Sequence, residues 1–306
     1  MDRALSPIAF AFPGAGIQPS GYEASLLALH AAAMRPCLER CGVRVGCDLA
    51  GAADGGFDAL PPLPRQAFTY AYGVGMAEAL RAAGESPAVV AGHSLGVYAA
   101  AVAAGATGID EGLALLEAAW RAGTSACADL GVGMAALAGL AEDEVASLPG
   151  VDGEAVRVVL VNAPGSVVLA GPIEPIEAAL AAATEAGAAR TAWLDREVAY
   201  HHPRYMARAA QALRDAAAGM AFGDPEVPVA STIDGRLLRR AEDVRAFLAA
   251  NLCTPIAWPR AIATFAAMGV EGVVECGPGL TLTRLARFLE PEMSWRNVRR
   301  LAKAAL

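Results

Sequence analysis

A serine between two nearby glycines is the first residue whose setting could carry chemistry. Residues 92–96, GHSLG, fit the pattern G-x-S-x-G, and they follow the apolar run Ala88–Ala91 and precede a helical pattern from Val97. Glycines at these places let a strand turn sharply into a helix, which leaves the serine hydroxyl exposed at the helix N-terminus. The helix dipole and free N–H groups there can stabilise an oxyanion. The pattern predicts a nucleophile at Ser94, and the alternative is a buried serine in a close-packed turn.

A serine nucleophile needs a base, which is normally histidine, and the chain has only four histidines. His30 lies in an alanine-rich helical pattern, and His93 should point away from Ser94 if the turn is sharp. His201 and His202 remain, at the end of a predicted strand. By elimination one of these two is the expected base. The alternative is that they are two surface histidines without a catalytic role.

The third member of a catalytic triad is not evident. Hydrolase triads of this kind run in the order serine, acid, histidine, with the histidine near the C-terminus, whereas about a hundred residues follow His202 here. Asp195 and Glu197 are candidates only because they are near in sequence. A dyad whose imidazole is held by a backbone carbonyl is the simpler prediction.

A second glycine loop, FPGAGIQ at residues 12–18, follows the apolar run Ile8–Phe12. It is not G-x-G-x-x-G, and no acidic residue follows in the right place, so a dinucleotide site is not expected. Its backbone N–H groups could instead supply half of an oxyanion hole. The alternative is a plain turn between a strand and a helix.

The elements that must position these residues alternate between strand and helix. Buried strands, glycine turns and helical patterns at 22–42 and 64–84 predict an α/β core with a parallel sheet. After Gly131 the order becomes β-α-β-β-α-β, which is typical of a ferredoxin-like unit. Its predicted elements are Met134–Leu140, Glu142–Leu148, Val156–Val161, Val167–Ala170, Ile173–Ala186 and Ala192–Ala199. We therefore predict a core formed by residues 1–131 and 198–306, with 132–197 as an inserted subdomain; later strands are expected at Val227–Ser231 and Val270–Glu275.

Composition limits the function. The 306 residues are 55% hydrophobic, enough for a sizeable core, and the net charge of −8 disfavours general binding to nucleic acid or an anionic membrane. No secretory leader opens the chain, and the uncharged stretch 86–109 contains His93 and Ser94, so we expect a cytoplasmic protein without a membrane span. No metal or redox cofactor is expected, because the cysteines lack CxxC spacing and should be reduced thiols: Cys37, Cys41, Cys47, Cys127, Cys253 and Cys276.

Seven motifs in order resemble the malonyl-CoA:acyl-carrier-protein transacylase family and the acyltransferases of polyketide synthases. They cover residues 8–288 and are FPGAGIQ (12–18), GHSLGVYAAAVAAG (92–105), GMAAL (133–137), NAPGSVVLAG (162–171), AYHHP (199–203), NLCTPIAW (251–258) and ECGPG (275–279). The resemblance implies an α/β-hydrolase-like large domain with a ferredoxin-like subdomain. It also implies ping-pong acyl transfer, in which a serine takes the acyl group from a thioester and passes it to a phosphopantetheine thiol.

The resemblance also implies roles for particular residues. Ser94 would be the nucleophile, and the backbone N–H groups of Ala15 and Leu95 would form the oxyanion hole. Ungapped counting from Gly171 favours His201 as the base, whereas counting back from Met206 favours His202, and we choose His201. Thr254 falls where the family supplies a carbonyl to orient the histidine. The resemblance places substrate contacts at Gln18, His93, Ala119, Trp120 and Asn162.

One departure from the family concerns the acyl group. Malonyl-type enzymes hold the acyl carboxylate with an Arg on a helix after the serine, and counting from Ser94 puts Ala119 there, beside Trp120. Arg121 is two positions on, about 200° around a helix, so it faces nearly the opposite way. An unpaired buried carboxylate is costly. We therefore expect a non-carboxylated acyl group, as in the discrete aminoacyl and dipeptidyl carrier-protein acyltransferases of polyketide macrolactam antibiotic pathways, which this sequence resembles.

Three alternatives remain open. The chain could be an ordinary malonyl-CoA:carrier-protein transacylase with Arg121 as the clamp, a hydrolase that clears carrier-bound acyl chains, or a non-catalytic docking subunit. The intact serine and histidines disfavour the last. The expected partner is an acyl carrier protein, and because carriers are typically acidic, docking needs a basic patch. The candidates for that patch are Arg204, Arg208, Arg236, Arg239, Arg240, Arg284 and Arg287.

Overall fold

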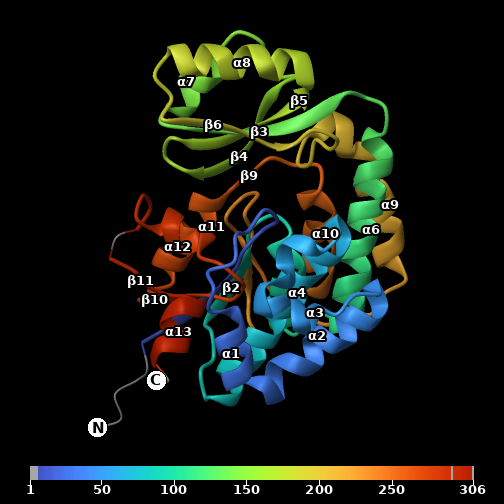
Figure 1. The fold of residues 1–306 in the computed structure, drawn as a ribbon, viewed down its shortest axis with the longest axis vertical. Coiled ribbons are helices and arrows are strands. Elements are labelled where there is room, and N and C mark those ends of the chain that lie inside the picture. Colours follow the sequence, from blue (N-terminus) through green and yellow to red (C-terminus); the bar gives the residue numbers. More distant parts are fainter. Residues whose placement is uncertain (1–5, 291, 305–306) are drawn as a thin grey trace.

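A six-stranded sheet forms the centre of the larger part of the molecule (Figure 1). The computed structural model describes residues 6–290 and 292–304. In spatial order the strands are β11 (Ser294–Arg296), β10 (Gly272–Glu275), β1 (Ile8–Phe12), β2 (Val89–Gly92), β7 (Val229–Ala230) and β8 (Leu237–Leu238). All neighbours are parallel except β7 and β8. The central strands are apolar throughout because helices cover both faces of the sheet.

Alternate residues of the central strands enter two different cores. Phe10 and Val90 belong to the larger core, and Ala9 and Val89 belong to a smaller one that includes Trp258. The larger core is built with α1 (Glu23–Leu29), α2 (Ala31–Val45), α4 (Pro62–Ala82), α5 (Gly96–Ala103), α6 (Ile109–Cys127), α9 (Pro203–Ala218), α10 (Ala241–Asn251) and α13 (Val298–Ala304). The smaller core contains α11 (Trp258–Ala267) and α12 (Thr281–Ala286). Between α2 and α4 lie three short turns, α3 (Leu49–Gly51), η1 (Ala52–Gly56) and η2 (Phe57–Ala59).

A second, five-stranded sheet stands at one end of the first (Figure 1). Its order is β6 (Arg190–Asp195), β3 (Val132–Ala138), β5 (Ser166–Pro172), β4 (Arg157–Ala163) and β9 (Ile256–Ala257). The helices α7 (Glu142–Ala146) and α8 (Ile173–Glu185) cover one face. The pairs are antiparallel except β4 with β9, which are parallel. Strand β9 comes from the chain well after residue 197, so the sheet is completed by a segment outside the predicted insertion.

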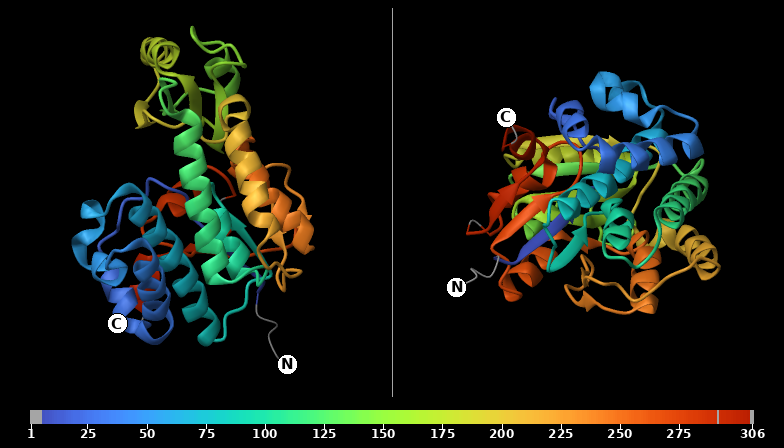
Figure 2. Two further views of the ribbon diagram at one scale, coloured as in Figure 1. Left: turned by 90° about the vertical axis from the view of Figure 1, so that its right-hand side faces the viewer. Right: turned by 90° about the horizontal axis from the view of Figure 1, so that it is seen from below.

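Two long helices connect the two sheets. Helix α6 leads from the first sheet into β3, and α9 runs back beside it, as the left view of Figure 2 shows. The chain therefore passes the boundary between the sheets at the ends of these helices. His201 and His202 lie at that boundary, immediately before α9.

The predicted α/β fold class, with a parallel sheet and a ferredoxin-like subdomain, is confirmed, and the element order from β3 to β6 is β-α-β-β-α-β. The last strand of that series ends earlier than expected, at Asp195 and not at Ala199. The Asp195 carboxylate accepts hydrogen bonds from the N–H groups of Glu197 and Val198, which closes a turn there. Within the described residues, no helix is both long and apolar enough to span a membrane.

Candidate active site

The turn between β2 and α5 holds Ser94 in a strained backbone conformation. Ser94 has a φ of 50°, in the left-handed region that residues other than glycine rarely occupy. Its flanking glycines are required by close contacts. A Cβ on Gly92 would lie 2.2 Å from the Gly96 carbonyl carbon, and one on Gly96 would lie 2.2 Å from the Phe12 oxygen. The G-x-S-x-G pattern is thus explained by a strand, a helix and a neighbouring loop that meet at one point.

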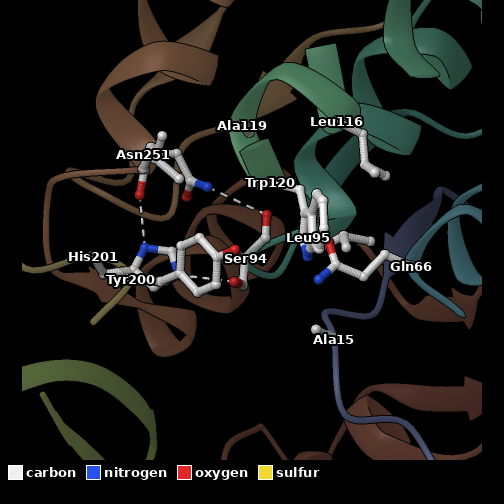
Figure 3. A pocket seen from close by; sticks show the side chains of 11 residues that line it. Ala15, Gln66, Ser94, Leu95, Leu116, Ala119, Trp120, Tyr200, His201 and Asn251 are labelled. Atoms are coloured by element: carbon white, nitrogen blue, oxygen red, sulfur yellow. Dashed lines mark hydrogen bonds between the residues drawn. The ribbon is translucent and has the colours of Figure 1, made fainter. Parts of the chain in front are cut away.

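Ser94 and His201 contact each other in a cavity of the larger part of the molecule, lined by residues of α4, α6 and the end of α10 (Figure 3). Ser94 Oγ lies 2.8 Å from His201 Nε2, and His201 Nδ1 lies 2.6 Å from the carbonyl oxygen of Asn251. A carbonyl only accepts, so Nδ1 carries the proton and donates it. Nε2 is then left unprotonated, as an acceptor for the Ser94 hydroxyl. The arrangement is a serine–histidine pair oriented by a backbone carbonyl.

The surroundings of His201 favour its neutral form. The side chain is 2% exposed, and burial lowers the pKa of His201 to about 4. The Asn251 carbonyl opposes this shift without overcoming it. At neutral pH the imidazole is therefore uncharged and able to take a proton from the serine.

The second histidine of the pair does not contact Ser94. His202 begins α9 as its N-cap, and its Nδ1 accepts a hydrogen bond from the Arg204 N–H at 3.2 Å. Of the carboxylates near in sequence, Asp195 is engaged in its own turn. The carbonyl hydrogen-bonded to His201 Nδ1 belongs to Asn251. The backbone of Thr254, where sequence counting had placed it, also acts on His201, and like Asn251 it opposes the lowering of the His201 pKa.

Two backbone amides stand beside the serine. Ala15 and Leu95 both line the cavity, and Leu95 is the N-cap of α5. Neither N–H donates a hydrogen bond to another group of the described chain. Both are therefore available to an oxyanion on a carbonyl carbon bound to Ser94 Oγ.

The rest of the cavity, which has a volume of about 50 Å³, is mainly apolar. Helix α6 contributes Leu116, Ala119 and Trp120, which share one face because they are spaced i, i+3, i+4. The other walls are Gln66 of α4, Tyr200, Asn251 and Leu252. Arg121 is exposed and does not line the cavity, and none of the described lining residues is Arg or Lys.

Three residues expected to contact substrate lie outside the cavity lining. His93 Nε2 is 2.8 Å from Asn162 Oδ1 of β4, and the His93 ring lies edge-on to Trp258, with ring centres 5.8 Å apart. These two polar side chains are bonded to each other at the boundary between the sheets and do not line this cavity. Gln18 follows the turn at Gly16, is exposed and does not line the cavity either. Contact of these three residues with substrate stays a prediction.

The sequence analysis missed five lining residues: Gln66, Leu116, Tyr200, Asn251 and Leu252. Only Leu116 had a usable signal, since it lies one helical turn before Ala119 and Trp120. Tyr200 lies in the motif AYHHP, and Asn251 and Leu252 begin the motif NLCTPIAW, but neither motif indicated that these side chains line the cavity. Gln66 lies in none of the seven motifs.

The arginines proposed for a docking patch are not equivalent. Arg236 pairs with Asp234 and Asp243, and Arg240 pairs with Glu242. For the other five, the described residues provide no carboxylate partner: Arg204, Arg208, Arg239, Arg284 and Arg287.

As to metals, no cluster of three or more His, Cys, Asp or Glu side chains occurs among residues 6–290 and 292–304.

Comparison with known proteins gives consistent matches. Residues 64–288 match the family described as acyl transferase domain. A malonyl CoA-acyl carrier protein transacylase of Salmonella typhimurium is 36% identical over 206 residues, which is 67% of this chain and 66%, just under two thirds, of that relative. The polyketide biosynthesis protein ThaF of Burkholderia thailandensis is 34% identical over 95% of this chain, which corresponds to 25% of ThaF.

Solved structures match over nearly the whole chain. The acyl-carrier-protein S-malonyltransferase of Burkholderia pseudomallei has a TM-score of 0.88 and 31% identity, over 97% of this chain and 99% of that one. A malonyl-transacylase in complex with its type II polyketide synthase acyl-carrier protein has a TM-score of 0.85 and 29% identity, over 95% of this chain and 96% of that one.

Proposed function

Because the chain belongs to the acyl transferase family, we propose that it moves an acyl group from a thioester, through an acyl-serine at Ser94, onto the phosphopantetheine thiol of an acyl carrier protein. We further propose that this acyl group carries no carboxylate. The observation behind the proposal is the Ser94–His201 contact, placed next to two free amides and an apolar cavity without a cation. The family resemblance expected from the sequence is confirmed by the matches above.

In the first half of the reaction, Ser94 Oγ attacks the carbonyl carbon of the thioester while His201 Nε2 takes the hydroxyl proton. The carbonyl oxygen becomes an oxyanion and is held by the N–H groups of Ala15 and Leu95. The C–S bond then breaks, and His201 gives its proton to the departing sulfur. The acyl group remains on Ser94 as an ester, and the donor leaves as a thiol.

In the second half the direction is reversed. The thiol of the acceptor pantetheine gives its proton to His201 Nε2 and attacks the ester carbonyl. The C–O bond to Ser94 breaks, and the proton passes from His201 to the serine oxygen. The Asn251 carbonyl binds Nδ1–H throughout, and this hydrogen bond keeps Nε2 directed at Ser94 and stabilises the transient imidazolium.

The walls of the cavity support a neutral acyl group. A carboxylate bound against Leu116, Ala119 and Trp120 would lose its hydration and gain no bidentate partner. The nearest arginine in sequence, Arg121, is exposed on another face of α6. An unpaired charge in such a place costs on the order of a few kcal/mol.

Loading of Ser94 by matched thioesters tests this proposal. Acetyl, butyryl, aminoacyl and malonyl thioesters on the same pantetheine arm should load at different rates, measured by intact mass, because only the acyl end differs. We expect the neutral and aminoacyl donors to react at least about a hundredfold faster than malonyl. The Ala119→Arg variant, with a cation on the cavity wall, should reduce or reverse that preference.

Arg121→Ala is the matched control and should leave the donor preference unchanged. Efficient malonyl loading that is lost in Arg121→Ala would instead establish an ordinary malonyl transacylase. An acyl-serine that disappears equally fast with and without a carrier protein would establish a hydrolase.

We propose that the carrier protein docks beside α12. Arg284 and Arg287 are exposed there without a carboxylate partner in the described chain, and Phe288 is 53% exposed next to them. The loop that precedes α12 packs on the loop that carries Ala15, since a Cβ on Gly277 would lie 2.4 Å from Pro13 Cγ. The loop before α12 thus contacts the loop that carries Ala15, and the basic and aromatic surface on α12 complements an acidic partner.

Charge reversal tests the docking surface. The double variant Arg284→Glu, Arg287→Glu should lower kcat/KM for a carrier-bound substrate about tenfold at low salt, mainly through association, and weaken its salt dependence. Arg35→Glu, an exposed site on α2, is the control and should have little effect. If kcat/KM fell equally for a small thioester donor, the double variant would be impaired in folding or catalysis and not in docking.

A further inference from the structure

The backbone at His201 is held in an unusual conformation that needs support. His201 has a φ of 63°, and with Ser94 and Asp129 it is one of three residues other than glycine with positive φ in the described chain. Such conformations persist only where neighbouring groups fix them. The His201 N–H donates to the Leu252 carbonyl, which fixes one side of the turn. The other side is fixed by the residue that follows.

His202 makes several contacts that end this turn and begin α9. Its N–H donates to the Ala199 carbonyl, and its own carbonyl accepts from Met206 N–H in the first turn of the helix. Its side-chain Nδ1 accepts from Arg204 N–H. Pro203, at the first helical position, has no N–H, so the Arg204 N–H is the first amide of the helix that needs an acceptor.

Capping by an imidazole requires one protonation state. Nδ1 can accept only if it is unprotonated, so the ring must be neutral with its proton on Nε2. His202 is 1% exposed, and burial together with the charge of Arg157 lowers the pKa of His202 to about 4, which agrees with a neutral ring. The ring also packs on Tyr205, with ring centres 4.5 Å apart.

We propose that His202 is a positioning residue for the reaction: by capping α9 through Nδ1 it fixes the left-handed backbone of His201 and so holds Nε2 of that residue against Ser94 Oγ. This inference rests on the proposed function, in which His201 is the base. His202 neither touches the substrate nor exchanges a proton in this role.

Three substitutions separate capping from packing. His202→Ser keeps a capping acceptor but loses the ring, His202→Phe keeps a ring but loses the acceptor, and His202→Ala loses both. If the cap positions His201, the variants His202→Ala and His202→Phe should lower the rate of Ser94 acylation about tenfold to a hundredfold with little change in KM. A small displacement of the base has effects of that size. Ser should recover most of the rate, to within about threefold of the unmodified enzyme.

Two controls distinguish a displacement of His201 from a general loss of folding. Asp48→Ala removes a comparable cap, Asp48 Oδ1 to Gly51 N–H at 2.8 Å, away from the cavity, and should leave the acylation rate unchanged. Thermal unfolding of each variant shows which ones are folded. The proposal is wrong if His202→Phe keeps the normal rate of Ser94 acylation while His202→Ser loses it. It is also wrong if a folded His202→Ala variant is acylated as fast as the unmodified enzyme.

A second readout does not depend on the natural acyl group. Labelling of Ser94 by a fluorophosphonate requires the serine–histidine pair but not the correct substrate. If the unmodified protein is labelled but accepts no acyl thioester, the proposed function fails while the labelling rates of the three variants still test the role of His202. The same order, with Ser above Phe and Ala, is expected in that assay.

Discussion

Replacing Ser94 by alanine should leave the protein folded and remove the acyl-enzyme entirely. Ser94 Oγ is the only nucleophile of the described cavity that is hydrogen-bonded to a neutral histidine. Loss of a nucleophile of this kind costs at least about a thousandfold in rate, so turnover should fall to near background. The measurement is intact mass after mixing with the best acyl thioester, followed by peptide mapping of any adduct.

Ser147→Ala is the matched control, because Ser147 ends the short helix α7 on the second sheet, away from the cavity. It should form the adduct at the normal rate. An adduct that persists on a cysteine or another serine of the Ser94→Ala variant would contradict the assignment of the nucleophile.

Replacing His201 by alanine should lower the rate of acylation by about a hundredfold to ten-thousandfold, the usual contribution of a general base. The pH dependence gives a second test of the same residue. The pKa of His201 is lowered to about 4, and only the neutral ring can take the proton, so activity should fall as the pH drops through about 4. An exposed histidine would lose activity near pH 6.5.

The acidic limb of the kcat/KM profile is therefore the measurement, and it should be absent from the residual activity of His201→Ala. Pre-incubation at each pH followed by assay at pH 7 separates titration from unfolding. A limb near pH 6.5, or an unchanged rate in His201→Ala, would contradict the assigned base.

The nucleophile could be predicted from the sequence because its signal is local. Gly92 is needed by a contact within the strand–turn–helix connection, and Gly96 is needed by a contact with Phe12 of the neighbouring strand. Their spacing around Ser94 is nevertheless a five-residue pattern that can be recognised in the sequence. The same holds for the order of elements in the second sheet, since alternation of strand and helix is a property of neighbouring residues.

The choice between His201 and His202 could not be made in this way. The two are adjacent, and only the left-handed turn at His201 and the start of α9 at Pro203 decide which ring faces the serine. The carbonyl of Asn251 was likewise out of reach, because it arrives from the end of another helix 50 residues away. Long-range contacts of this kind leave no periodic pattern in the sequence.

The lining of the cavity includes residues that the sequence could predict and residues that it could not. Ala119 and Trp120 were placed at the substrate by an ungapped count from Ser94 against the family pattern, and the structure brings both to the cavity wall. Gln66 comes from α4, and nothing near it in sequence distinguishes it from an ordinary helix residue. Leu252 follows α10 and belongs to a family motif, but that motif does not show that its side chain reaches the cavity. Gln18 was assigned to substrate by the family resemblance alone, and the structure places it beyond the turn at Gly16, outside the cavity lining.

The pairing of β4 with β9 has a consequence for how the cavity is used. Strand β9 follows Asn251 by only a few residues, and Asn162 of β4 binds the histidine next to the nucleophile. A rotation of the second sheet relative to the first would therefore displace both the turn that carries Ser94 and the Asn251 carbonyl that orients His201. Enzymes that close around their substrates place hinges where few contacts cross. Here the contacts between the two sheets include a hydrogen bond of the residue next to the nucleophile, so we expect little hinge motion at this boundary and exchange of acyl chains through a mouth that stays open.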